Sequence, residues 1–193
     1  MAVEKDFELM KLEYQFYAEK ADLHYRAVES TIRLYFVLIA GFMSLIAYVY
    51  KDDFDNVKVN ELNFLILGIT SVLFIIGLIS FFKVAEHRLL LLNYIRSLNA
   101  IRRWFIDNSD VSEEYFLFEP NKKMPSYFRR FRHFYWELLG IASLNSFWGL
   151  VLFSNLCSSI SVLWLPLICI ILIILQMSYF RLRAYNKEKA ESK

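Results

Sequence analysis

The segment from residue 62 to residue 105 decides the fold. It begins with an uncharged stretch, "LNFLILGITSVLFIIGLISFF" (62–82), and soon becomes the arginine-rich "EHRLLLLNYIRSLNAIRRWF" (86–105). About 20 apolar residues suffice to span a bilayer as a helix, so the first part is typical of a transmembrane helix. Each arginine costs several kcal/mol at the bilayer centre, so the second part must lie outside the lipid. The spacing of its apolar residues still predicts a helix, because they recur every three or four positions along one face. These residues, its apolar row, are Leu91, Tyr94, Ile95, Leu98, Ile101 and Phe105.

Two further runs without charge flank this segment. The first is "LYFVLIAGFMSLIAYVY" (34–50), and the second, residues 138–180, is about twice the length that one span needs. A polar interruption, "SNLCSSIS" (154–161), followed by Pro166, divides the second run into two spans. The chain is 57% hydrophobic, above the 45–50% of soluble domains, so we predict an all-α integral membrane protein with four transmembrane helices.

The basic residues predict the orientation. Four spans place both termini and residues 83–137 on one side, which holds all of the 22 lysines and arginines except Lys51 and Lys58. Cytoplasmic segments carry the excess of basic residues, so both termini are expected in the cytoplasm, with the protein in the inner (cytoplasmic) membrane.

The N-terminal segment predicts a helix that runs into the first span without proline or glycine. Its apolar row comprises Phe7, Met10, Tyr14, Tyr17, Ala21, His24 and Val28. The simplest way to bury this row is against the row of residues 86–105, which forms a cytosolic helical hairpin below the membrane. Two rows make a thin core, so we also expect self-association.

Five segments follow from these assignments. They are a cytosolic amphipathic helix leading into the first span (1–33), a transmembrane hairpin (34–82) with an external loop (51–61), a cytosolic segment (83–137), a second transmembrane hairpin (138–180) and a basic cytosolic tail (181–193). Within the cytosolic segment we expect a helix, a loop and an interfacial helix of aromatics and arginines that opens at Pro125, a favoured first helical position.

No catalytic motif is present in the sequence. Nucleotide-binding glycine loops, the zinc-protease motif and the serine-hydrolase motif are all missing, and no cysteine pair has metal spacing. The protein is therefore expected not to be an enzyme and to need no cofactor. Direct nucleic-acid binding is not expected, because acidic residues are interspersed among the basic ones.

Polar and small residues of the third span admit two interpretations. They either pack helices within a bundle or oligomer, or line a pore between helices. These residues are Ser143, Asn145, Ser146, Gly149, Ser154 and Asn155. The fourth span is nearly all aliphatic and is expected to face lipid.

Two groups of basic residues are candidate contact sites. The first either binds anionic lipid headgroups or a ligand, or only fixes the topology, and comprises Lys122, Lys123, Arg129, Arg130 and Arg132. The second is a candidate surface for a cytosolic protein partner and comprises Arg88, Arg96, Arg102 and Arg103.

The order of these segments resembles a known class. An amphipathic helix ("EYQFYAEKADLHYRAVESTIRLYF", 13–36) enters two close spans, and an arginine- and leucine-rich helix (86–105) leaves them. This is similar to small bacterial multi-pass membrane proteins of conflict systems, namely SLATT-like or four-helix pore-forming effectors, and to the membrane subunit of Kiwa-type anti-phage systems. The pair of spans over 138–180 departs from the two-span SLATT pattern.

The resemblance implies a defence protein that senses a trigger or perturbs the inner membrane. We therefore expect a non-enzymatic, homo-oligomeric membrane sensor or permeabilising effector with a cytosolic partner. The alternative is a structural, assembly or accessory subunit of a membrane complex that does not conduct.

Overall fold

A computed structural model describes residues 2–52, 59–108, 125–127, 133–156 and 164–191 of the chain. These residues form four helices: α1 (Ala2–Asp52), α2 (Val59–Asn108), α3 (His133–Leu156) and α4 (Leu165–Glu191). Every regular element within the described ranges is a helix, and each of the four is long and apolar enough to cross a membrane. The predicted all-α class with four such helices is confirmed.

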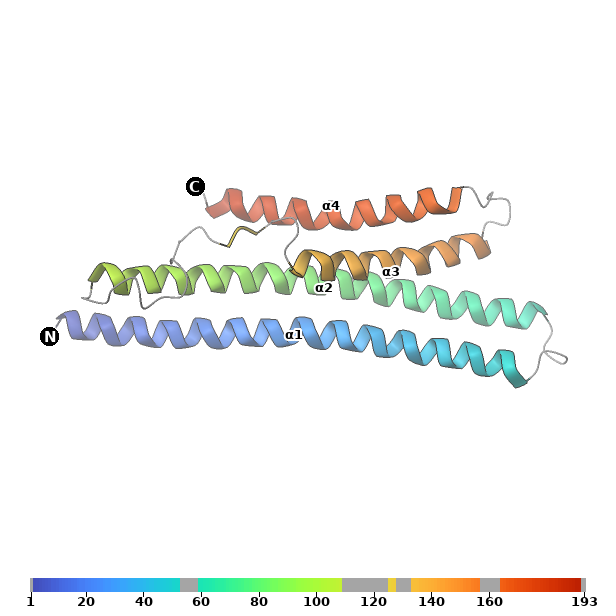
Figure 1. Cartoon of the computed structure of the whole chain (residues 1–193), viewed down its shortest axis with the longest axis horizontal. Helices are drawn as coiled ribbons and strands as arrows, with labels where there is room; N and C mark the ends of the chain where they lie inside the picture. Colours follow the sequence, from blue (N-terminus) through green and yellow to red (C-terminus); the bar gives the residue numbers. More distant parts are fainter. Residues whose placement is uncertain (1, 53–58, 109–124, 128–132, 157–163, 192–193) are drawn as a thin grey trace.

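Helices α1 and α2 are long antiparallel rods that lie side by side (Figure 1). They contain 51 and 50 residues and are therefore each about 75 Å long, more than twice the ~30 Å of a bilayer's hydrocarbon core. We call residues 34–50 and 62–82, with α3 and the first part of α4, the apolar half. Residues 2–33 and 83–108 form the polar half.

The contact between α1 and α2 follows the two rows predicted from the sequence. At the far end of the polar half, the ring of Phe7 lies 5.3 Å from that of Trp104 and 5.3 Å from that of Phe105. Further along, the rings of Tyr17 and Tyr94 are 6.1 Å apart. Steps of three and four residues keep one face of each helix towards the other, as in a coiled coil.

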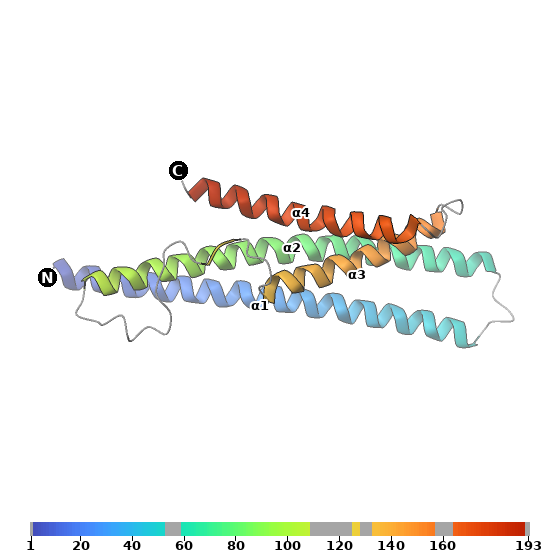
Figure 2. The ribbon, with the colours of Figure 1, turned by 45° about the horizontal axis from the view of Figure 1, so that its top comes forward.

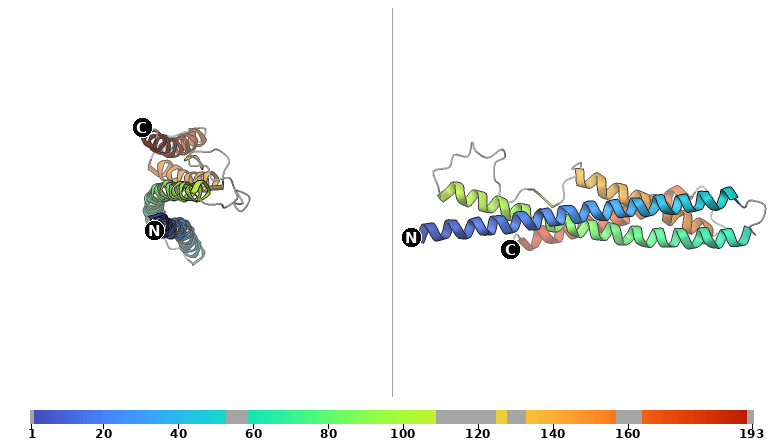
Figure 3. Two further views of the ribbon diagram at one scale, coloured as in Figure 1. Left: turned by 90° about the vertical axis from the view of Figure 1, so that its left-hand side faces the viewer. Right: turned by 90° about the horizontal axis from the view of Figure 1, so that it is seen from below.

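Helix α2 is the centre of the molecule. It carries α1 on one side and α3 on the other, and α4 packs mainly on α3 (Figures 2 and 3). One core joins all four helices and includes Tyr35 on α1, Phe81 and Leu89 on α2, Leu138 on α3 and Phe180 on α4. The last part of α4 extends back along the polar half of α2.

The start of α3 differs from the prediction. A helix was expected from Pro125, but Pro125–Tyr127 is not helical and α3 begins at His133. The side chain of Tyr127 is fully buried, so these residues pack into the molecule as an irregular strap rather than opening a helix. Helix α4 begins at Leu165 with Pro166 in its first turn, where the missing N–H costs no hydrogen bond.

Candidate functional site: buried polar groups where the helices meet

A hydrogen-bonded network links α3 to α4 inside the apolar half. The Asn145 side-chain amide donates to Gln176 Oε1 at 3.1 Å, and Gln176 Nε2 donates to Ser146 Oγ at 3.1 Å. Gln176 Nε2 also donates to the Leu172 carbonyl at 3.2 Å. Asn145, Ser146 and Gln176 are buried, so these bonds are made where water cannot replace them.

Gly77 of α2 lets Tyr35 of α1 approach this network, although neither the Tyr35 hydroxyl nor Asn145 Oδ1 makes a hydrogen bond within the described residues. A Cβ atom at Gly77 would lie 2.3 Å from Asn145 Oδ1 and 2.6 Å from the Tyr35 hydroxyl, both far inside normal contact distance. The glycine therefore lets a polar atom of α3 and one of α1 meet over the backbone of α2. Tyr35 is fully buried at this point. We call the five residues that meet here the four-helix polar cluster: Tyr35 on α1, Gly77 on α2, Asn145 and Ser146 on α3, and Gln176 on α4.

Ion pairs surround the boundary between the two halves. Arg88 on α2 is buried and pairs with Glu137 on α3, whose carboxylate also lies 2.9 Å from His133 Nδ1. Glu86, near Arg88 on α2, pairs with Arg183 on α4 at 2.6 Å. A buried arginine is tolerated when a carboxylate neutralises its charge. Together, the two ion pairs hold α3 and α4 at the same level along α2.

Two histidines join α1 to α2 in the polar half. His24 Nδ1 and His87 Nδ1 are 2.8 Å apart, and the His24 ring stacks on Tyr94 with 5.4 Å between centroids. Such a bond needs one protonated and one unprotonated Nδ1, so at least one ring is neutral. Burial, then Lys20, lowers the pKa of His24 below its ordinary 6.5. Burial, then His24 and Lys83, lowers the pKa of His87.

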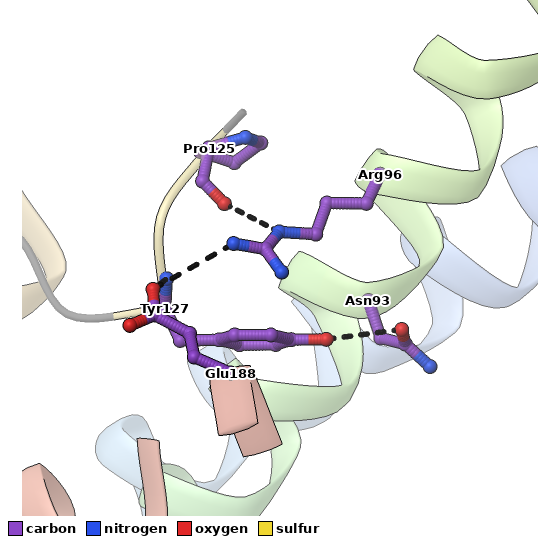
Figure 4. Close-up of polar contacts among 5 residues, drawn as sticks. All are labelled: Asn93, Arg96, Pro125, Tyr127 and Glu188. Carbon is purple, nitrogen blue, oxygen red and sulfur yellow. Dashed lines mark hydrogen bonds and ion pairs between the residues drawn. The ribbon is translucent and has the colours of Figure 1, made fainter. Parts of the chain in front are cut away.

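The irregular strap is held by a second cluster, shown in Figure 4. Arg96 Nε donates to the Pro125 carbonyl at 2.8 Å, and its guanidinium lies over the Tyr127 ring, 4.0 Å from the centroid. The Tyr127 hydroxyl donates to Asn93 Oδ1 at 3.0 Å, and the Tyr127 N–H donates to Glu188 Oε1 at 3.0 Å. The strap is thereby fixed between α2 and the end of α4.

The structure separates the candidate residues of the third span into two groups. Asn145, Ser146 and Gly149 are buried in helix contacts, and Gly149 lies against Phe74 and Leu172. Ser154 and Asn155 are exposed and both bond to the Val151 carbonyl of their own helix, at 2.9 and 2.7 Å. Ser143 is partly buried.

The four arginines expected to face a partner all make contacts within the chain. Arg88 and Arg96 have the partners described above, Arg102 donates to the Tyr14 hydroxyl at 3.0 Å, and Arg103 pairs with Asp107 at 3.0 Å. The basic candidates Lys122, Lys123, Arg129, Arg130 and Arg132 lie outside the described residues.

Gln176 was not predicted as a site residue. The fourth span was expected to be an aliphatic, lipid-facing helix, whereas one face of α4 carries a buried amide that bonds to α3. The signal was present, because Gln176 is the one amide in "LPLICIILIILQMSYF" (165–180). An amide within an apolar span costs free energy unless another helix satisfies it.

A scan against protein-family models finds no match to this chain. Searches of curated proteins and of solved structures find no match either. Within the described ranges, the histidine, cysteine and acidic side chains form no group of three that could hold a metal ion.

Proposed function

We propose that this chain is a non-enzymatic, multi-pass protein of the bacterial inner membrane that couples a cytosolic partner to the membrane, as a sensor or a permeabilising effector. The apolar half would lie in the bilayer, with both termini and the polar half in the cytoplasm. The anti-phage defence setting follows from the architectural resemblance alone.

The observation that carries the proposal is the continuity of α1 and α2. Each runs unbroken from the polar half into the apolar half, so a force applied to one end reaches the other without passing through a loop. The ion pairs of Arg88 and Glu86 join α2 to α3 and α4, and Tyr35 packs α1 into the core that all four helices share. A protein that docks on residues 5–30 or 85–106 could thereby change the packing within the bilayer.

A row of exposed apolar side chains on α1 supports an interaction surface in the polar half. Leu9, Leu12, Phe16 and Leu23 are 52–63% exposed, and each lies two residues after a position that faces α2. A shift of two residues turns a helix by about 200°, so this row is on the side of α1 away from α2. Exposed apolar rows of this kind are typical of helix association.

The alternative is a structural or accessory subunit that does not conduct, and one observation favours it. Asn145 and Ser146, the buried polar candidates of the third span, already make hydrogen bonds to Gln176 within a single chain. Any polar pathway would then have to form between copies, where the exposed Ser154 and Asn155 are the described candidates on α3.

The deciding experiment measures membrane potential with a voltage-sensitive dye in bacteria induced to make this protein alone. A permeabilising effector depolarises the cells, and Ser154→Leu with Asn155→Leu reduces the effect at equal membrane abundance. Ser44→Leu, on the exposed side of α1, is the matched control and leaves it unchanged. An unchanged potential with normal growth contradicts the permeabilising form and favours a sensor or the non-conducting alternative.

Self-association is tested separately. Cross-linking in membranes and sizing in mild detergent are expected to show assemblies of more than one copy. If the exposed row of α1 contributes, the double variant Leu12→Glu with Phe16→Glu should form fewer of these assemblies. A strictly monomeric chain in both measurements would count against the proposal.

A further inference from the structure

A groove lies between α1 and α2 at the boundary of the apolar and polar halves. Its volume is about 200 Å³, and both helices line it. An apolar cavity of ~150 Å³ already accommodates a benzene molecule, so the groove has room for part of a hydrocarbon chain. Two lining side chains, Leu34 and Ile79, are 59% and 60% exposed, so the groove opens to the outside of the bundle.

One end of the groove is polar on both helices. Ser30 and Thr31 contribute hydroxyls from α1, and Ser80 and Lys83 contribute a hydroxyl and an ammonium from α2. The Thr31 hydroxyl donates to the Ala27 carbonyl and keeps its acceptor side. Among the described residues, no hydrogen bond or ion pair engages the Lys83 ammonium. Lys83 therefore offers an unneutralised positive charge, with hydroxyls next to it.

The other end is apolar on both helices. Leu34 and Leu38 follow the hydroxyls along α1, while Ile79 and Ile76 precede Lys83 along the antiparallel α2. Tyr35 also lines this end, with its hydroxyl at Gly77. The path from Ser30 to Leu38 is about 12 Å long. Polarity thus falls in the same direction on both walls, from a cationic, hydroxyl-rich end to an aliphatic end.

We propose that this groove binds one anionic phospholipid, with its phosphate at Lys83 and Ser80 and an acyl chain along Leu34, Leu38 and Ile79. The inference rests on the proposed membrane location, which puts the polar end at headgroup height. A zwitterionic lipid would leave the ammonium without a net negative partner, and a soluble phosphate would leave the aliphatic end uncovered.

Native mass spectrometry of the full chain tests the preference for an anionic lipid. The protein is released from detergent that contains equal amounts of phosphatidylglycerol and phosphatidylcholine of the same acyl length. The wild type should retain phosphatidylglycerol about fivefold better, the contribution of one lysine near an anionic headgroup. Lys83→Gln removes the preference, and Lys20→Gln, a lysine away from the groove, preserves it. Glycerol phosphate at millimolar concentration does not displace the lipid.

A pair of tryptophan variants tests the acyl-chain part of the groove. Ile79→Trp fills it and reduces retention of both lipids, whereas Ile75→Trp, one turn away and also exposed, leaves retention unchanged. Equal behaviour of the two variants, an unchanged preference in Lys83→Gln, or displacement by glycerol phosphate would each overturn the inference. Failure of the membrane proposal itself would be seen earlier and differently, as protein in the soluble cell fraction.

Discussion

Gln176 shows how much a single side chain can decide at the scale of the residue. Its amide donates to Ser146 and accepts from Asn145, and both partners belong to another helix. Because these side chains are buried, water cannot replace a lost partner. Removing only one of the two side chains therefore leaves the other amide unpaired, which costs more stability than removing both.

A double-mutant cycle should reveal this coupling. Gln176→Leu and Asn145→Leu are each expected to destabilise the purified protein in detergent, and the double variant by less than their sum. The difference should be about 1 kcal/mol, within the range of hydrogen bonds between membrane helices. Thermal or denaturant unfolding measures it, with Ser178→Ala on the exposed side of α4 as the control. Additive effects would mean that the two amides act independently.

The histidine pair predicts a dependence on pH. Both pKa values lie below 6.5, so the unfolded chain binds more protons than the folded one in the interval beneath 6.5. The stability that the pair contributes is complete above pH 6.5 and is lost as the pH falls through the folded-state values. Acidification from pH 7.5 to 5.5 should therefore lower Tm in the wild type.

The control for this effect is His87→Gln, which removes one titrating group and the Nδ1–Nδ1 contact. Its Tm should be lower at pH 7.5 and should fall less on acidification. Ser178→Ala, a change without a titrating group on the exposed side of α4, should show the wild-type slope. The same slope in His87→Gln and in the wild type would contradict the assignment to this pair.

At the scale of the element, Gly77 sets the separation of three helices. Gly77→Ala would force Asn145 and Tyr35 away from α2, so we expect a destabilisation of about 1–3 kcal/mol, the usual cost of overpacking. Gly68→Ala is the matched control on the same helix, because a Cβ there meets nothing within 4 Å. Unfolding of both variants in detergent should show a loss for Gly77→Ala only. Equal stability of the two would show that α1 and α3 can move apart without cost.

The elements were largely predictable from the sequence, and their contacts were only partly so. The apolar residues from Phe7 to Val28 recur at steps of three and four, so they lie on one face of a helix. In the structure, this face of α1 packs against α2. Pro125 was misread as a helix start because the burial of Tyr127 under Arg96 depends on residues distant in the sequence. Gln176 was missed for the same reason, since its partners come from another helix.

At the scale of the whole molecule, the proposed orientation can be tested by labelling. In a background of Cys157→Ser and Cys169→Ser, a cysteine introduced by Asn56→Cys lies in the expected external loop, and one introduced by Asn186→Cys lies near the C-terminus. A membrane-impermeant maleimide should label the first in intact spheroplasts and the second only after permeabilisation, as the distribution of basic residues predicts. The reverse pattern would place the polar half outside the cell.

The four-helix polar cluster also has a consequence for biogenesis. Its last member, Gln176, is on α4. In the proposed membrane location, Asn145 and Ser146 would reach the bilayer before Gln176 joins them. During that interval the third span would carry an amide that hydrocarbon cannot solvate. A chain that is incomplete or wrongly inserted would keep this unpaired amide. A membrane quality-control protease could recognise the amide until the fourth helix packs against the third.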